Sequence, residues 1–122
     1  MLIAAIATQL RVFDLERSVR FYIDRLGFTQ EFCHGDFYIG LRAAGTSLHL
    51  KKVDAPDPSI PFVQAGDHLH LYLTVSDIDA AFKEIRGNAE VVAPITTKPW
   101  GLREFTIRDP DGHTIYIAQA SA

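Results

Sequence analysis

Two histidines and the single tryptophan are the side chains best suited to chemistry in this sequence. His49 and His70 each stand in a segment of alternating apolar and polar residues, 47–53 and 68–75. An imidazole can bind a divalent metal ion, take up a proton near neutral pH or donate a hydrogen bond to a substrate. Trp100 stands between a proline and a glycine, which indicates a loop that presents a large aromatic ring for stacking.

Each of these functional interpretations has a structural alternative. Trp100 could cover the edge of the core, and both histidines could be satisfied by polar neighbours. His70 is the best candidate for a general base. Asp109 and Asp111 have the side chains of catalytic acids, but the run Asp-Pro-Asp-Gly is typical of a tight turn. We therefore predict a structural role for both carboxylates.

Two further residues are candidates for ligand binding. Arg103 could fix a polar ligand or pair across a dimer, and a solvent-facing strand is the alternative for it and for Glu104. Phe62 stands at the end of a proline-rich stretch, where it could cover a ligand as a lid or simply dock on the protein.

Length, charge and cysteine content exclude several classes of protein. A chain of 122 residues fits one domain with one core. A net charge of −3 and the absence of a basic stripe predict no nucleic-acid partner. No apolar run approaches the length of a membrane span, and a single cysteine allows no disulfide framework. We expect a cytoplasmic protein with no membrane partner.

The first half of the chain has the pattern of a β-α-β-β-β module. Asp14 is expected to cap a helix that Gly27 ends. The apolar residues of that helix repeat at helical spacing. The expected strands cover residues 3–12, 28–32, 37–41 and 47–53.

The second half repeats the first. Residues 7–12 match residues 70–75, and residues 45–50 match residues 112–117 in alternation and turn placement. Asp77 is expected to cap a helix that Gly87 ends. Expected extended segments cover residues 68–75, 90–93, 106–107 and 114–117. Between the halves, three prolines in residues 54–61 predict a linker without regular structure.

These patterns predict an α+β fold. We expect a single domain of 122 residues, with module one over about 1–53 and module two over about 62–122. The two β-α-β-β-β modules would form a curved mixed sheet with the helices on its outer face. Alternation places a set of polar side chains on the inner, cup-forming face. That set is Gln9, His49, Lys51, His70, Tyr72, Thr114 and Tyr116.

Three segments resemble the vicinal oxygen chelate superfamily, which includes glyoxalases, extradiol dioxygenases and bleomycin resistance proteins. They are residues 12–22 (VFDLERSVRFY), 26–28 (LGF) and 109–112 (DPDG). Residues 100–105 (WGLREF) look most like the bleomycin resistance branch. The resemblance covers nearly the whole chain. It implies the fold described above, a homodimer and four metal positions.

The implied metal positions fall on Ala7, His49, His70 and Tyr116. Alanine has no ligand atom, and a phenol is a poor ligand for zinc near neutral pH because its pKa is about 10. A catalytic zinc site generally needs three protein ligands. We therefore expect no metal cofactor, although a divalent metal at His49 and His70 stays possible if Glu31 or Glu104 adds a carboxylate.

The resemblance and the residues together suggest a binding protein of the bleomycin resistance type. It would sequester an aromatic or cationic small molecule in a cleft at the dimer interface. The candidate ligand-binding residues are Trp100, Tyr116, His70, Tyr72, His49, Phe62 and Arg103. The alternative is a metal-dependent enzyme that uses His49 and His70, either a glyoxalase-like lyase or an extradiol dioxygenase. Such an enzyme would polarise vicinal oxygens of its substrate with the metal.

Overall fold

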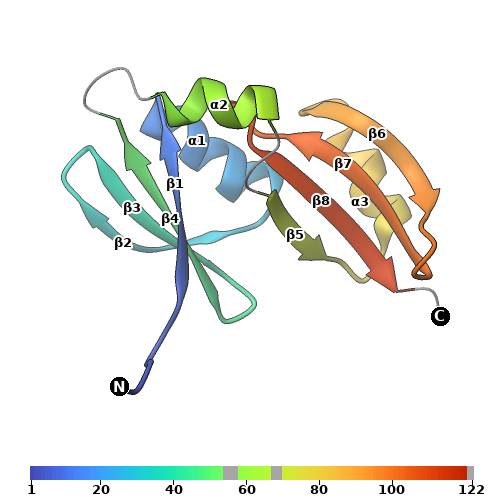
Figure 1. The fold of residues 1–122 in the computed structure, drawn as a ribbon, viewed down its shortest axis with the longest axis horizontal. Helices are drawn as coiled ribbons and strands as arrows, with labels where there is room; N and C mark the ends of the chain where they lie inside the picture. The colour runs from blue at the N-terminus through green and yellow to red at the C-terminus, as the bar shows by residue number, and fades with distance from the viewer. Residues whose placement is uncertain (54–57, 67–69, 121–122) are drawn as a thin grey trace. The chain divides into compact units, whose positions relative to one another are not determined.

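Each half of the chain contains one four-stranded mixed sheet. The computed structural model describes residues 1–53, 58–66 and 70–120 (Figure 1). The chain divides into two compact units, Met1–Ile60 and Pro61–Ala122. Both sheets contain one parallel and two antiparallel strand pairs. The predicted α+β fold with two β-α-β-β-β modules is confirmed.

The first unit begins with β1 (Ala7–Val12), which leads into a helical segment. α1 (Leu15–Arg20) continues directly into a π-helical turn, η1 (Phe21–Arg25). The Asp14 side chain caps α1 as predicted, because its carboxylate accepts a hydrogen bond from the Arg17 backbone N–H at 3.0 Å. β2 (Thr29–His34), β3 (Tyr38–Ala43) and β4 (Thr46–Lys52) follow, and the strand order is β1-β4-β3-β2 (Figure 1).

The second unit repeats this arrangement. β5 (His70–Thr74) is followed by α3 (Ile78–Ile85), β6 (Glu90–Thr97), β7 (Leu102–Arg108) and β8 (Thr114–Ala120). Asp77 caps α3 by accepting a hydrogen bond from the Ala80 backbone N–H at 3.0 Å. The strand order is β5-β8-β7-β6, which is the order of the first unit (Figure 1). Residues 68 and 69 of the predicted strand lie outside the described residues.

The apolar face of each sheet carries the core. α1 packs on β4 in the first unit, and α3 packs on β7 and β8 in the second. Six residues on this face of β1, β4 and β8 are buried. They are Leu10, Val12, Leu48, Leu50, Ile115 and Ile117. Leu71 and Leu73, on the edge strand β5, are only half-buried. Thr114, which was predicted on the inner face, is buried. It lies on β8, between two neighbouring strands, and only 4% of it is exposed.

The proline-rich segment departs from the prediction. Residues 54–61 were expected to lack regular structure, but α2 (Ser59–Gly66) begins within them. Pro61 lies in the first turn of α2, where backbone N–H groups have no partner inside the helix. Proline has no backbone N–H, so at this position the helix loses no hydrogen bond. Residues 54–57 lie outside the described residues. No helix among the described residues is long and apolar enough to cross a membrane.

Candidate functional site

A tyrosine, a buried glutamate and the tryptophan form a connected polar group in the second unit. The Tyr72 hydroxyl donates a hydrogen bond to Glu104 Oε2 at 2.9 Å. The indole of Trp100 lies near the same hydroxyl. Glu104 is 3% exposed, whereas Tyr72 is 49% and Trp100 63% exposed. The group therefore runs from a buried carboxylate to an accessible aromatic ring.

Two further rings extend this group along the same face of the sheet. β5 and β8 place Tyr72 directly opposite Tyr116, with ring centroids 6.2 Å apart. The His70 ring stacks on Tyr116 at 5.1 Å with an interplanar angle of 15°. Because side chains two apart on a strand share one face, His70 and Tyr72 lie on the same side of β5. The structure thus brings together four predicted ligand-binding residues, His70, Tyr72, Trp100 and Tyr116.

The surroundings of Tyr72 change how its hydroxyl ionises. Burial of the hydroxyl raises the pKa of Tyr72 above its usual value, and the hydrogen bond to Glu104 raises it further. The nearby indole N–H of Trp100 acts in the opposite direction, because a donor close to the hydroxyl stabilises the phenolate. Tyr72 therefore stays a neutral donor to Glu104 over a wider range of pH than an isolated tyrosine would.

A tight turn between β6 and β7 presents the Trp100 ring. The Gly101 N–H donates to the Lys98 carbonyl at 2.9 Å, and the Lys98 N–H donates to the Leu102 carbonyl at 2.8 Å. Pro99 fits the position after the first residue of such a turn. Gly101 has φ 92°, which a residue with a side chain rarely adopts. This turn fixes the backbone that carries Trp100.

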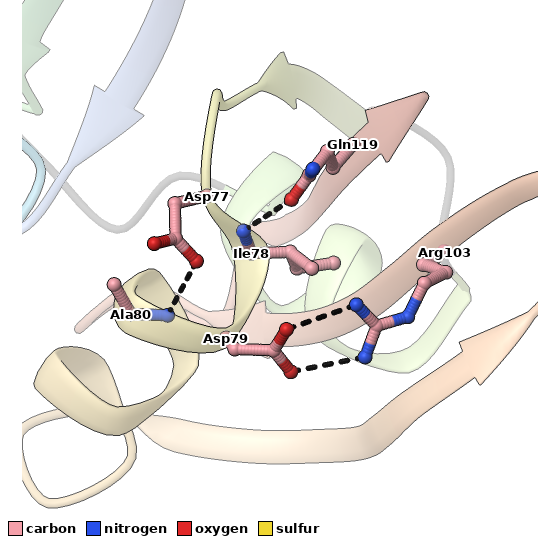
Figure 2. Close-up of polar contacts among 6 residues, drawn as sticks. All are labelled: Asp77, Ile78, Asp79, Ala80, Arg103 and Gln119. Carbon is pink, nitrogen blue, oxygen red and sulfur yellow. Dashed lines mark hydrogen bonds and ion pairs between the residues drawn. The ribbon is translucent and has the colours of Figure 1, made fainter. Parts of the chain in front are cut away.

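Arg103 lies on the opposite face of β7 from Glu104. It forms two hydrogen bonds to the Asp79 carboxylate on α3, at 2.9 and 3.0 Å (Figure 2). The hydrogen bonds from Arg103 hold the pKa of Asp79 below its usual value. Near them the Ile78 N–H donates to Gln119 Oε1 at 2.6 Å, which ties the start of α3 to β8 (Figure 2). Arg103 is thus not brought to the face of Tyr72, and its contact is with the helix.

Phe62 lies on α2 and is 59% exposed. α2 is tied to the turn between β7 and β8, because Gln64 Nε2 donates to the Asp111 carbonyl. Arg108 on β7 also donates to the Gln64 carbonyl, at 3.4 Å. These contacts attach the helix that carries Phe62 to its own unit.

His49 belongs to a second polar group, which lies in the first unit. The Tyr38 hydroxyl lies 2.8 Å from His49 Nδ1, and Gln9 Nε2 donates to the Tyr38 oxygen at 3.0 Å. The Phe32 ring meets His49 edge to face at 5.0 Å and stacks on Tyr38 at 6.1 Å. A Cβ atom at Gly40 would clash with the Phe32 ring, so this glycine lets the ring lie against the sheet.

The two polar groups occupy equivalent places in the two modules. β1 carries Gln9 opposite His49 on β4, and β5 carries Tyr72 opposite Tyr116 on β8. In each unit the residue on the first strand hydrogen bonds to a side chain on the third, Tyr38 or Glu104. A solvent-facing strand was the alternative expected for Glu104, but this side chain is 3% exposed. The missed signal was the alternation of side chains along β7, which puts Glu104 and Arg103 on opposite faces of the strand.

The donor set does not fit a metal centre with three protein ligands. Of the four implied positions, Ala7 has no donor atom and Tyr116 offers a phenol against which the His70 ring is stacked. Glu31 is paired with Arg42, and Glu104 accepts from Tyr72. In residues 1–53, 58–66 and 70–120, no three His, Cys, Asp or Glu side chains group in a way that could hold a metal ion.

Asp109, in the turn between β7 and β8, has the structural role that was predicted for it. Asp109 Oδ1 accepts hydrogen bonds from the backbone N–H groups of Asp111 and His113, at 2.9 and 2.8 Å. Gly112 has φ 92°, and its N–H donates to the Asp109 carbonyl at 3.0 Å. This closed turn fixes the register in which β7 and β8 pair, and with it the place of Tyr116.

Known structures share this fold over nearly their whole length. TioX from Micromonospora sp. ML1 is 24% identical over 97% of this chain and 99% of its own, with a TM-score of 0.75. A protein of unknown function from Agrobacterium tumefaciens str. C58 is 27% identical over 99% of this chain and 95% of its own, with a TM-score of 0.71. The bleomycin-binding protein from bleomycin-producing Streptomyces verticillus, complexed with copper(II)-bleomycin, is 23% identical over 100% and 99%, with a TM-score of 0.68.

A search of the curated proteins gave no match. A family model matches residues 3–117, which include both polar groups and every helix and strand except the end of β8. The chain therefore belongs to the glyoxalase/bleomycin resistance protein/dioxygenase superfamily.

Proposed function

We propose that this protein binds a small molecule with an aromatic or cationic part and sequesters it without chemical change. The observation that carries the proposal is Trp100, an exposed ring on a closed turn whose indole lies near the Tyr72 hydroxyl. An exposed aromatic ring held in this way offers a stacking surface at little cost in side-chain entropy.

Charge and the neighbouring rings support the same proposal. A flat ligand on Trp100 would also lie near the exposed part of Tyr72, which is bonded to Glu104. Aromatic faces attract cations, and a carboxylate beside them strengthens that attraction. The net charge of −3 adds a small bias in the same direction. Phe62 lies on α2, which is tied to the other end of β7 from Trp100, so it would contact only a ligand long enough to extend along that strand.

Similarity to a bleomycin-binding protein agrees with this function. That protein is 23% identical, and a likeness at this level concerns the fold.

We further propose that the chain forms a homodimer with its binding clefts at the interface, as its family membership suggests. Light scattering that gives the mass of a single chain at micromolar concentration would contradict the dimer.

Fluorescence of the single tryptophan tests the binding proposal directly. Titration with metal-free bleomycin and with flat aromatic cations should quench or shift the emission of Trp100, because the ligand would stack on its ring. Calorimetry with Trp100→Ala should show binding weaker by roughly tenfold to a hundredfold, the equivalent of about 1.5–3 kcal/mol of buried aromatic surface.

Phe37→Ala is the matched control for this experiment. Phe37 is also an exposed aromatic residue in a turn, at 46%, but it lies in the first unit and outside both polar groups. This variant should bind as the wild type does. Emission that stays constant across all these ligands, or equal weakening in the two variants, would reject Trp100 as the binding surface.

A further inference from the structure

The hydrogen bonds around His49 form a short directed chain across three strands of the first unit. Gln9 on β1, Tyr38 on β3 and His49 on β4 lie on one face of the sheet. The distances are 3.0 Å from Gln9 Nε2 to the Tyr38 oxygen and 2.8 Å from that oxygen to His49 Nδ1. The first bond uses Tyr38 as an acceptor, which leaves its hydroxyl proton available for the second.

An amide nitrogen can only donate, so the Tyr38 oxygen accepts from Gln9. The single hydroxyl proton of Tyr38 is then free to point at His49 Nδ1. A neutral imidazole carries one proton, and a nitrogen that accepts a hydrogen bond does not hold it. When each group of the chain donates to the next in this way, the ring proton of His49 lies on Nε2.

The packing around the ring keeps His49 in this orientation. Phe32 contacts the His49 ring edge to face at 5.0 Å and lies parallel to Tyr38, with an interplanar angle of 15°. Phe32 can lie there because Gly40 has no side chain. Both partners of the hydrogen bond are thus held by the same aromatic ring.

We propose that Gln9 and Tyr38 are positioning residues that hold His49 as a fixed Nε2–H hydrogen-bond donor. The half-buried His49 would offer this donor to an acceptor oxygen, such as a carbonyl or carboxylate, on the ligand of the proposed function. The assignment of the proton itself does not depend on that ligand. It also opposes metal binding at Nε2, because a metal needs the lone pair there and the Tyr38 hydroxyl proton would have to turn away from Nδ1.

Long-range ¹H–¹⁵N correlation spectra of the unliganded, ¹⁵N-labelled protein test this proposal. At a pH where imidazoles are neutral, Nε2 of His49 should resonate as a protonated nitrogen and Nδ1 as an unprotonated, hydrogen-bonded one. In Tyr38→Phe the Nδ1 signal should move downfield, because its hydrogen-bond donor is lost. An Nδ1–H form in the wild type, or an unmoved signal in Tyr38→Phe, would overturn the proposal.

Gln9→Glu is the sharper variant, because it exchanges a donor for an acceptor of the same shape. The Tyr38 hydroxyl should turn to the new carboxylate and accept from His49, so the His49 proton should move to Nδ1. Gln9→Met has similar length without polarity and should leave the proton on Nε2. A proton that stays on Nε2 in Gln9→Glu would also overturn the proposal. These spectra are recorded without a ligand, so a protein that failed to bind bleomycin would still show where the His49 proton lies.

Discussion

At the scale of single residues, Tyr72 is the side chain on which the contacts of the second unit converge. Burial of its hydroxyl and the hydrogen bond to Glu104 raise its pKa above the usual value. A folded-state pKa above the unfolded value means that this group stabilises the fold at lower pH. That contribution is lost as the pH rises through the folded-state pKa.

Glu104→Gln should lower the pKa of Tyr72, because it removes the carboxylate that disfavours a neighbouring phenolate. Absorbance of tyrosinate during alkaline titration measures the change. The chain has four tyrosines, so the curve for Tyr72 is obtained by subtracting that of Tyr72→Phe. Asp79→Asn, which removes a carboxylate from α3 instead, is the control and should leave the curve unchanged. A Tyr72 pKa that is equal in Glu104→Gln and the wild type would contradict the role of this bond.

At the scale of elements, the turn between β7 and β8 depends on a single carboxylate. Asp109 is 5% exposed and accepts two backbone hydrogen bonds. Asp109→Ala leaves both N–H groups without this acceptor and should lower the free energy of unfolding by about 2–4 kcal/mol. Asp109→Asn keeps the accepting oxygen and should cost clearly less. Denaturant unfolding measures both variants, and equal losses would contradict the assigned geometry.

The packing of Phe32 over Gly40 makes a second prediction at this scale. Gly40→Ala should destabilise the protein by about 1–3 kcal/mol, because the added methyl group displaces the Phe32 ring. The same substitution in a Phe32→Ala background should cost much less. A double-mutant cycle by denaturant unfolding gives the coupling between the two sites. Strictly additive losses would show that the ring is not the obstacle.

The sequence predicted these elements well where the signal was local. Asp14 and Asp77 cap the expected helices, and strand alternation placed Gln9, His49, Tyr72 and Tyr116 correctly on one face of their sheets. One local feature was not predicted. The start of α2 inside the proline-rich segment was missed because Pro61 falls in the first turn of that helix, where proline is tolerated.

Long-range polar contacts were the other features that the sequence did not predict. The bond from Tyr38 to His49 needs the register of β3 against β4, and no propensity contains that register. Arg103 was expected to bind ligand because its type suits that role. It lies instead on the helix side of β7, where Asp79 is its partner. Residue type suggested the role, and strand position decided it.

At the scale of the whole molecule, the superfamily's name covers both metal enzymes and binding proteins, so the donor atoms must decide between them. His49 and His70 are the two imidazoles at the implied metal positions, and two imidazoles alone hold a divalent ion weakly. The protein purified without chelator and then dialysed should therefore contain well under one equivalent of zinc, iron or manganese per chain. Elemental mass spectrometry measures this content.

The variants His49→Ala and His70→Ala make the metal measurement decisive. Both should contain as little metal as the wild type, because neither removes part of an existing centre. His34→Ala is the matched control, since His34 is an exposed histidine outside the implied positions. The wild type and the control could instead contain one equivalent of metal that both histidine variants lose. That result would reverse the conclusion that the protein holds no tightly bound metal. The metal-dependent lyase or dioxygenase would then replace sequestration as the better account of this chain.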